Sequence, residues 1–243
     1  MYDFIRKGFL LGALMILASG CASTQPAPAP TVAPVSVAPT TAPASSSSSA
    51  ASVSASNPGS GSNVIRLVAV PSKSEARYRV REQLANVSLP SDAIGKTNAI
   101  SGTIVGKTDG TIVSSDSKFV VDLRTLVSDR SQRDGFLQSS VLQTNRYPNA
   151  VFVPTQTQGL ASPVATSGQA TFKLIGDLTI RDVTKPVTWD VTCKGEGTEG
   201  TCQATTNFTF EYFNITQPRV PVVLSVVDNI VLELDIDLQR ASN

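Results

Sequence analysis

The sequence predicts an all-β fold, an antiparallel barrel or sandwich that follows a long segment without regular structure. Two observations carry this prediction. After residue 63, apolar and polar residues alternate with a period of two in several stretches, which is typical of strands with one buried and one solvated face. Before residue 64, small uncharged residues and proline dominate, and such a composition cannot bury enough apolar surface to fold.

The first residues have the pattern of an export signal. Two basic residues precede an apolar run, residues 8–18, which is too short to cross a bilayer because a spanning helix needs about 20 apolar residues. The run leads into small residues and Cys21, as in bacterial lipoproteins, whose cysteine thiol is alkylated with diacylglycerol. Ala18 stands where leucine is most common, so an ordinary secretory signal is the alternative. We expect residues 1–20 to be a lipoprotein signal peptide and Cys21 to carry lipid.

The next segment, residues 21–63, is predicted to be a disordered tether. Between residues 22 and 62 it contains no charged side chain and is rich in alanine, proline, serine and threonine. The proline-rich first half favours extended chain, and the serine-rich second half favours flexible chain. We expect this tether to hold a single folded domain, residues 64–243, away from a membrane surface.

Strand alternation is clearest in four parts of this domain, residues 118–124, 172–180, 187–193 and 230–238. Strands of this length, separated by turn residues, favour an antiparallel barrel or sandwich. A barrel would leave no exposed sheet edge.

The cysteines are predicted to pair as a hairpin disulfide. The chain has three cysteines, so lipid on Cys21 would leave Cys193 and Cys202 as a pair. Strand alternation places both of their side chains on the apolar face, with a glycine-containing loop between them. A disulfide persists outside a reducing cytosol, so the pair and the export signal agree on the compartment. Two free buried thiols are the alternative.

One segment, residues 128–144, departs from strand alternation. Phe136, Leu137 and Val141 lie about one helical turn apart among polar residues, and Pro148 follows the segment. We expect short helical turns that pack an apolar edge over one end of the barrel.

Composition disfavours several classes of function. The chain has no histidine, which removes the commonest general base and transition-metal ligand, and we expect no enzyme activity, metal or cofactor. The net charge is +1 and becomes zero without the export signal, so no basic excess favours nucleic-acid binding.

Several motifs resemble the YceI-like family. They are Ser-Gln-Arg-Asp-Gly-Phe-Leu at residues 131–137, Tyr-Pro-Asn-Ala-Val-Phe at 147–152, Gly-Asp-Leu-Thr-Ile-Arg-Asp-Val-Thr-Lys-Pro-Val at 176–187, and Asp-Asn-Ile-Val-Leu at 228–232. The chain lacks the arginine and glycine that the family often has near residues 207–215. The resemblance implies a lipocalin-like β-barrel that binds a long isoprenoid, such as a polyprenyl lipid or a quinone, in its interior.

Alternating apolar residues are the candidates for the lining of such a barrel. They are Phe119, Val121, Leu123, Phe172, Leu174, Trp189, Val191, Phe208, Phe210, Leu232 and Leu234. Each could instead simply fill a solid core. Arg133 and Asp134 are candidates for a pocket mouth that meets a ligand headgroup, and a structural ion pair at a helix start is the alternative.

Two functions follow from these patterns. The first is a membrane-tethered, extracytoplasmic carrier for an isoprenoid or similar apolar lipid. The second is a non-catalytic structural or stress-related surface lipoprotein whose barrel is filled and which binds a protein partner. A hollow or a packed interior distinguishes the two.

Overall fold

The computed structural model describes residues 64–241, which belong to one compact unit. The predicted signal peptide, the lipidation site Cys21 and the predicted tether lie outside the described residues and stay predictions. Within residues 64–241, no helix combines the length and the apolarity needed to cross a bilayer.

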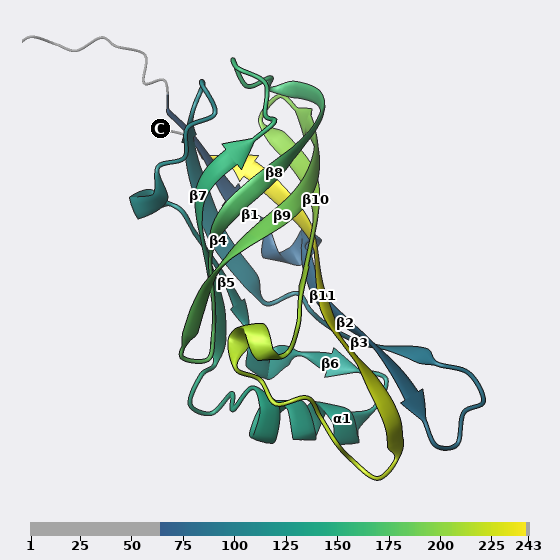
Figure 1. Ribbon diagram of the computed structural model, residues 1–243. Helices are drawn as coiled ribbons and strands as arrows, with labels where there is room; N and C mark the ends of the chain where they lie inside the picture. The colour runs from purple at the N-terminus through teal and green to yellow at the C-terminus, as the bar shows by residue number, and fades with distance from the viewer. Residues whose placement is uncertain (1–63, 242–243) are drawn as a thin grey trace, which may run out of the picture. The chain divides into compact units, whose positions relative to one another are not determined.

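Eight strands of the described chain close into an antiparallel barrel, which confirms the predicted all-β, lipocalin-like fold (Figure 1). Each strand pairs with the next in the ring, and the last pairs with the first. The ring runs in the order β1 (Val64–Ala69), β4 (Ile100–Lys107), β5 (Lys118–Asp122), β7 (Asn149–Gln158), β8 (Ser167–Ile180), β9 (Val183–Glu196), β10 (Glu199–Phe208) and β11 (Val223–Arg240).

The longest strand, β11, pairs with β10 along one edge and divides its other edge between β1 and β2 (Glu75–Leu84). Its C-terminal end pairs with β1, where Leu67 lies opposite Arg240, and this pairing closes the ring. Its remaining length pairs with β2, which is followed in the sheet by β3 (Ser91–Thr97) and β6 (Val127–Ser128). A short 3-10 turn, η1 (Pro71–Lys73), separates β1 from β2. The sheet therefore extends past the closed ring at one end of the barrel.

The predicted helical segment lies at this extended end (Figure 1). It consists of α1 (Ser131–Phe136) and a π-helical turn, η4 (Leu137–Val141). Phe136 and Leu137 pack against the barrel core, as their spacing predicted. The other short helical turns are η2 (Ser114–Asp116), η3 (Leu123–Thr125) and η5 (Glu211–Phe213).

Two predicted strands end earlier than their alternation suggests. Leu123 begins η3 rather than continuing β5, because the Asp122 carboxylate accepts a hydrogen bond from the backbone N–H of Arg124 and caps the turn. Phe210 lies beyond the end of β10, yet its side chain is buried. Both residues keep an inward position in spite of leaving their strands.

The predicted disulfide joins Cys193 on β9 to Cys202 on β10. The two residues lie directly opposite each other, with their Cα atoms 4.0 Å apart. The hairpin is tighter than the sequence suggested, because both strands continue until only Gly197 and Thr198 remain between them. Gly197 has a φ of +70°, which glycine adopts without strain.

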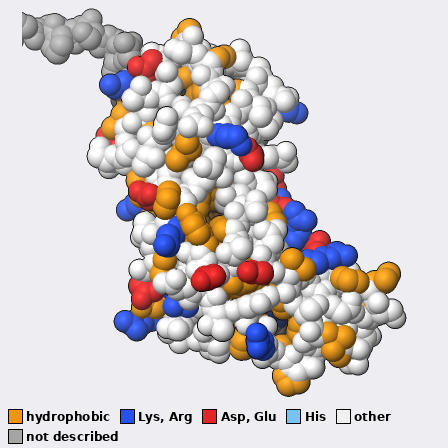
Figure 2. All heavy atoms as spheres, viewed as in Figure 1, with side chains coloured by type: hydrophobic (Ala, Val, Ile, Leu, Met, Phe, Trp, Pro, Cys, Tyr) orange, Lys and Arg blue, Asp and Glu red, His pale blue; other side chains and the backbone are white. Residues whose placement is uncertain are grey.

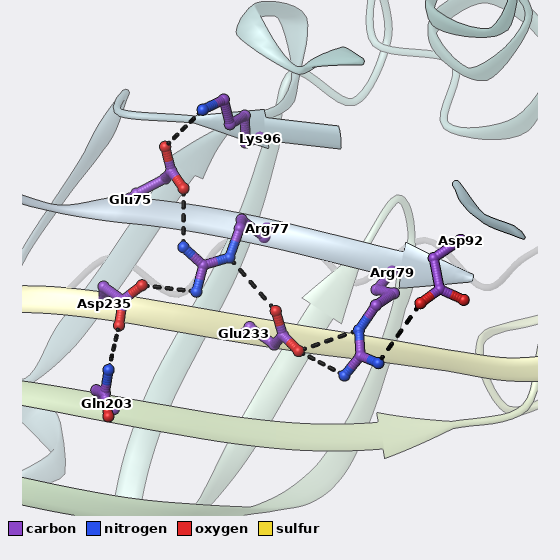
Figure 3. A network of polar contacts seen from close by, with 8 residues as sticks. All are labelled: Glu75, Arg77, Arg79, Asp92, Lys96, Gln203, Glu233 and Asp235. Atoms are coloured by element: carbon purple, nitrogen blue, oxygen red, sulfur yellow. Dashed lines mark hydrogen bonds and ion pairs between the residues drawn. The ribbon is translucent and has the colours of Figure 1, made fainter. Parts of the chain in front are cut away.

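The outer face of β2 carries a network of polar contacts to β3 and β11, and Asp235 of β11 extends it to Gln203 of β10 (Figure 3). Arg77 lies at its centre and contacts Glu75 at 2.8 Å and Asp235 at 2.6 Å. Arg79 contacts Glu233 at 2.6 Å on the neighbouring strand. The hydrogen bond from Arg77 holds the pKa of Glu75 below its usual value. The Arg77–Asp235 and Arg79–Glu233 pairs link β2 to the part of β11 that precedes its pairing with β1.

Candidate ligand cavity

The barrel encloses an elongated cavity of about 780 Å³. All eight strands of the ring contribute side chains to its wall. On β8 the lining residues run from Ser167 to Ile180, which corresponds to roughly 30 Å along the barrel axis for a tilt of about 40°. The volume lies within the range of roughly 300–1,000 Å³ that is usual for small-molecule sites. The interior is therefore hollow, which favours the first of the two predicted functions over a filled barrel.

All eleven candidate lining residues border this cavity, and most of the wall is apolar. They are Phe119, Val121, Leu123, Phe172, Leu174, Trp189, Val191, Phe208, Phe210, Leu232 and Leu234. Two of them, Phe208 and Trp189, also pack against other aromatic rings. The Phe208 ring meets that of Phe213 at 4.6 Å, and the Phe152 ring meets that of Trp189 at 5.9 Å. These contacts tie the wall to the hydrophobic core, to which all four rings belong.

Sequence reasoning missed much of the wall that the first half of the domain supplies. Ile65 and Leu67 on β1, and Ile100 and Ile104 on β4, line the cavity. On β1, Ile65 and Leu67 alternate with exposed neighbours, a signal that could have been found in a stretch of only six residues. On β4, glycines interrupt the apolar alternation.

The extended end of the cavity contains a buried ion pair. Arg133 of α1 contacts Glu82 of β2 at 2.5 Å, and their side chains are only 13% and 8% exposed. Arg133 also pairs with Asp129. Burial by itself would lower the pKa of Arg133. The hydrogen bonds that Arg133 donates to Asp129 and Glu82, and their negative charges, outweigh burial and raise that pKa. Two carboxylates thus neutralise the arginine, so it offers no free positive charge to a ligand.

The structure separates the two residues proposed for the pocket mouth. Arg133 borders the cavity, whereas Asp134 does not. The Asp134 carboxylate instead accepts hydrogen bonds from the backbone N–H of Ser128 at 3.0 Å and from its hydroxyl at 2.6 Å. Asp134 therefore holds the start of the helical segment through Ser128, and Arg133 is the member of the pair that borders the cavity.

Two buried donors of the described residues lack a protein partner and belong to cavity-lining side chains. They are the Tyr78 hydroxyl on β2 and the Trp189 indole N–H on β9. Burial raises the pKa of Tyr78 to about 12, so its hydroxyl keeps its proton at neutral pH. The Tyr78 ring lies against Gly95 of β3, where a Cβ atom would stand 2.2 Å from the ring. Both donor atoms are fully buried within the wall, so neither presents a surface to the cavity.

Residues 64–241 contain no group of three or more histidine, cysteine or acidic side chains arranged to hold a metal ion.

Comparison with protein families supports the fold. A family model described as a YceI-like domain matches residues 68–238, most of the described chain.

Curated relatives match over part of their length. A UPF0312 protein of Pseudomonas putida strain W619 is 42% identical over 84 residues, which are 33% of this chain and 40% of that protein. A UPF0312 protein of Shewanella denitrificans is 34% identical over 128 residues, which are 49% of this chain and 63% of that protein. The chain thus spans less than two thirds of either relative.

Two solved structures share the architecture. A polyisoprenoid-binding domain from Saccharophagus degradans, implicated in plant cell wall breakdown, aligns with a TM-score of 0.58 at 11% identity and covers 72% of this chain and 98% of that one. BcnA from Burkholderia cenocepacia aligns with a TM-score of 0.50 at 15% identity and covers 70% of this chain and 98% of that one. At these identities the likeness shows the fold alone.

Proposed function

The chain belongs to the YceI-like family, and from this premise we propose that its barrel binds a long apolar lipid of the isoprenoid class without transforming it. The observation that carries the proposal is the hollow, apolar interior of about 780 Å³. A structural neighbour that is itself a polyisoprenoid-binding domain adds support.

The cavity wall suits a hydrocarbon chain better than a polar ligand. Each methylene group moved from water into such a wall contributes about 0.8 kcal/mol, so a long chain can bind tightly with few polar contacts. Arg133 is already neutralised by Glu82 and Asp129, which argues against a strongly anionic headgroup.

The proposal includes a place for the protein. Export, lipid attachment at Cys21 and a tether over residues 21–63 would hold the barrel outside the cytoplasm and near a membrane. The Cys193–Cys202 disulfide supports this location, because such bonds persist in oxidising compartments. Replacing Cys21 with serine should release the protein from membranes in a cell fractionation. A Cys21→Ser protein that stays in the membrane fraction would contradict lipid attachment there.

Native mass spectrometry of the full-length protein, followed by lipid extraction, tests the carrier function. We expect a mass shift that corresponds to one bound lipid in part or all of the protein. Ala204 and Thr205 are neighbours on β10, and the first side chain is buried at the cavity while the second is exposed. Ala204→Phe should therefore reduce lipid occupancy several-fold, whereas Thr205→Phe should leave it unchanged.

The same pair of variants distinguishes a hollow barrel from a filled one. In a tightly packed interior, inserting a phenylalanine costs about 1–3 kcal/mol of stability. In a hollow one, Ala204→Phe should keep the melting temperature of Thr205→Phe. A lipid-free parent protein, together with a strongly destabilised Ala204→Phe variant, would overturn the proposed function.

A further inference from the structure

Five apolar side chains are exposed together at the extended end of the barrel, and we call them the apolar rim. They come from the loop between β2 and β3 and from the start of β11 and the residue before it, and they are Val87, Leu89, Val222, Leu224 and Val227. Leu89 is 74% exposed and Leu224 is 67% exposed.

The two segments of the rim are joined by backbone pairing. Leu84 lies opposite Val223, and the N–H of Ala85 donates to the carbonyl of Val222 at 3.0 Å. Figure 2 shows hydrophobic side chains gathered at this end of the molecule, where Figure 1 places the β2–β3 hairpin and the start of β11. The rim is therefore one surface and not a set of scattered residues.

The rim is continuous with the cavity. Val87 and Val222 belong both to the exposed rim and to the cavity wall. Leu84 and Val223, which lie between the rim segments, also line the cavity. A hydrocarbon chain leaving the cavity at this end would thus pass over apolar side chains.

The two segments of the rim carry few charged side chains. The loop segment, residues 83–91, contains no charged side chain. The second segment, residues 214–227, contains one, Arg219, which is basic and exposed. By contrast, the outer face of β2 carries Arg77 and Arg79 in its ion-pair network only a few residues away. The exposed Asp92 and Asp228 directly follow the two segments, so the rim is an uncharged apolar surface with charges at its border, which suits contact with apolar lipid.

We propose that the apolar rim docks on the surface of a phospholipid bilayer, where the long apolar lipid enters and leaves the barrel. The proposal rests on the proposed function, because a ligand of that class resides in a bilayer and is strongly disfavoured in water. Direct contact between rim and bilayer would let the hydrocarbon chain move from one apolar environment to the other.

Depth-dependent quenching of a single tryptophan tests this docking. The chain contains one tryptophan, Trp189, so Trp189→Phe removes the intrinsic signal. In that background, with Cys21→Ser to prevent lipid attachment, Leu224→Trp places a reporter on the rim. Val68→Trp is the matched control, because Val68 is an exposed apolar residue of β1 outside the rim. Both proteins are mixed with phosphatidylcholine and phosphatidylglycerol vesicles that carry brominated acyl chains.

We expect the rim tryptophan to lose at least half of its emission and the control tryptophan less than a tenth. Equal quenching at both positions, or none at either, would overturn the docking proposal. A concentration-dependent dimer in sedimentation velocity that Leu89→Ser with Leu224→Ser abolishes, without quenching by vesicles, would also overturn it and assign the rim to a second copy of the chain.

The outcome for docking is separable from the outcome for lipid binding. Quenching of the rim tryptophan would keep the docking even if the parent carries no lipid by native mass spectrometry and Ala204→Phe is strongly destabilised, the pair of results that overturns the proposed function. A parent that carries lipid but whose rim reporter is not quenched would keep the proposed function and overturn the docking.

Discussion

Reducing the Cys193–Cys202 disulfide should lower the melting temperature of the protein by roughly 5–10 °C. The bond closes a loop with a sequence separation of 9, for which the chain-entropy relation gives about 2.6 kcal/mol of stabilisation. For a domain of this size, each kcal/mol corresponds to about 2–4 °C. The expected shift is modest because the loop is short.

Thermal unfolding followed by circular dichroism, with and without a phosphine reductant, measures this shift. Alkylation and mass spectrometry establish that the bond is fully reduced. The Cys193→Ala, Cys202→Ala variant should melt near the reduced parent and should not respond to the reductant. Trp189 lies four residues before Cys193 on β9. Its emission at 25 °C should be unchanged, because the chain-entropy relation assigns the stabilisation by the disulfide to the unfolded state.

Two results would refute this reasoning. A shift below about 2 °C on complete reduction would show that the hairpin is ordered in the unfolded chain or that the bond stores strain that offsets its entropy. A loss of Trp189 emission at 25 °C would show that the bond holds the folded barrel wall in place.

Two further predictions concern the β2 strand. Gly95→Ala should destabilise the protein by about 1–3 kcal/mol in urea unfolding, because the added Cβ atom would stand 2.2 Å from the Tyr78 ring. Gly135→Ala is the control: its Cβ atom would meet nothing within 4 Å, so the change should be neutral or stabilising by up to about 1 kcal/mol. Equal effects of the two substitutions on stability would contradict the contact between Gly95 and Tyr78. The hydrogen bond from Arg77 holds the pKa of Glu75 below the ordinary value for a glutamate, so its ion pairs stabilise the fold above that ordinary pKa, and this contribution disappears as the pH falls through the lowered pKa. The parent should lose more stability than Arg77→Gln between pH 5 and pH 3, and parallel pH profiles of the urea midpoint would rule out this role for the pair.

Local alternation predicted the strands well where a stretch was long and regular. On β8 and β9, every second side chain faces inward over many residues. The alternation therefore places on the inner face four residues that line the cavity, Phe172, Leu174, Trp189 and Val191. The disulfide followed from the same parity. Leu123 shows the limit, since its side chain faces the cavity while its backbone has already left the strand.

Other features depend on pairings between distant parts of the chain and could not be predicted from local patterns. The division of β11 between β1 and β2 is one, because nothing near Arg240 indicates that it lies opposite Leu67. Whether the interior is hollow is another, since inward-facing apolar residues have the same spacing in a packed barrel and in an empty one. The family resemblance, and not the alternation, indicated a cavity.

The two ends of the barrel are stabilised to different degrees, and this difference bears on how a ligand could enter. At one end the Cys193–Cys202 bond crosslinks β9 to β10, and β1 pairs with the last residues of β11. At the other end, the pairing of β11 with β2 is irregular, with register shifts between Val223 and Ser225 and between Val226 and Ile230. Fewer regular ladder bonds mean a lower cost of local opening. The apolar rim lies on this less regular end, so the surface proposed to meet a bilayer adjoins a part of the wall whose local opening breaks fewer regular ladder bonds.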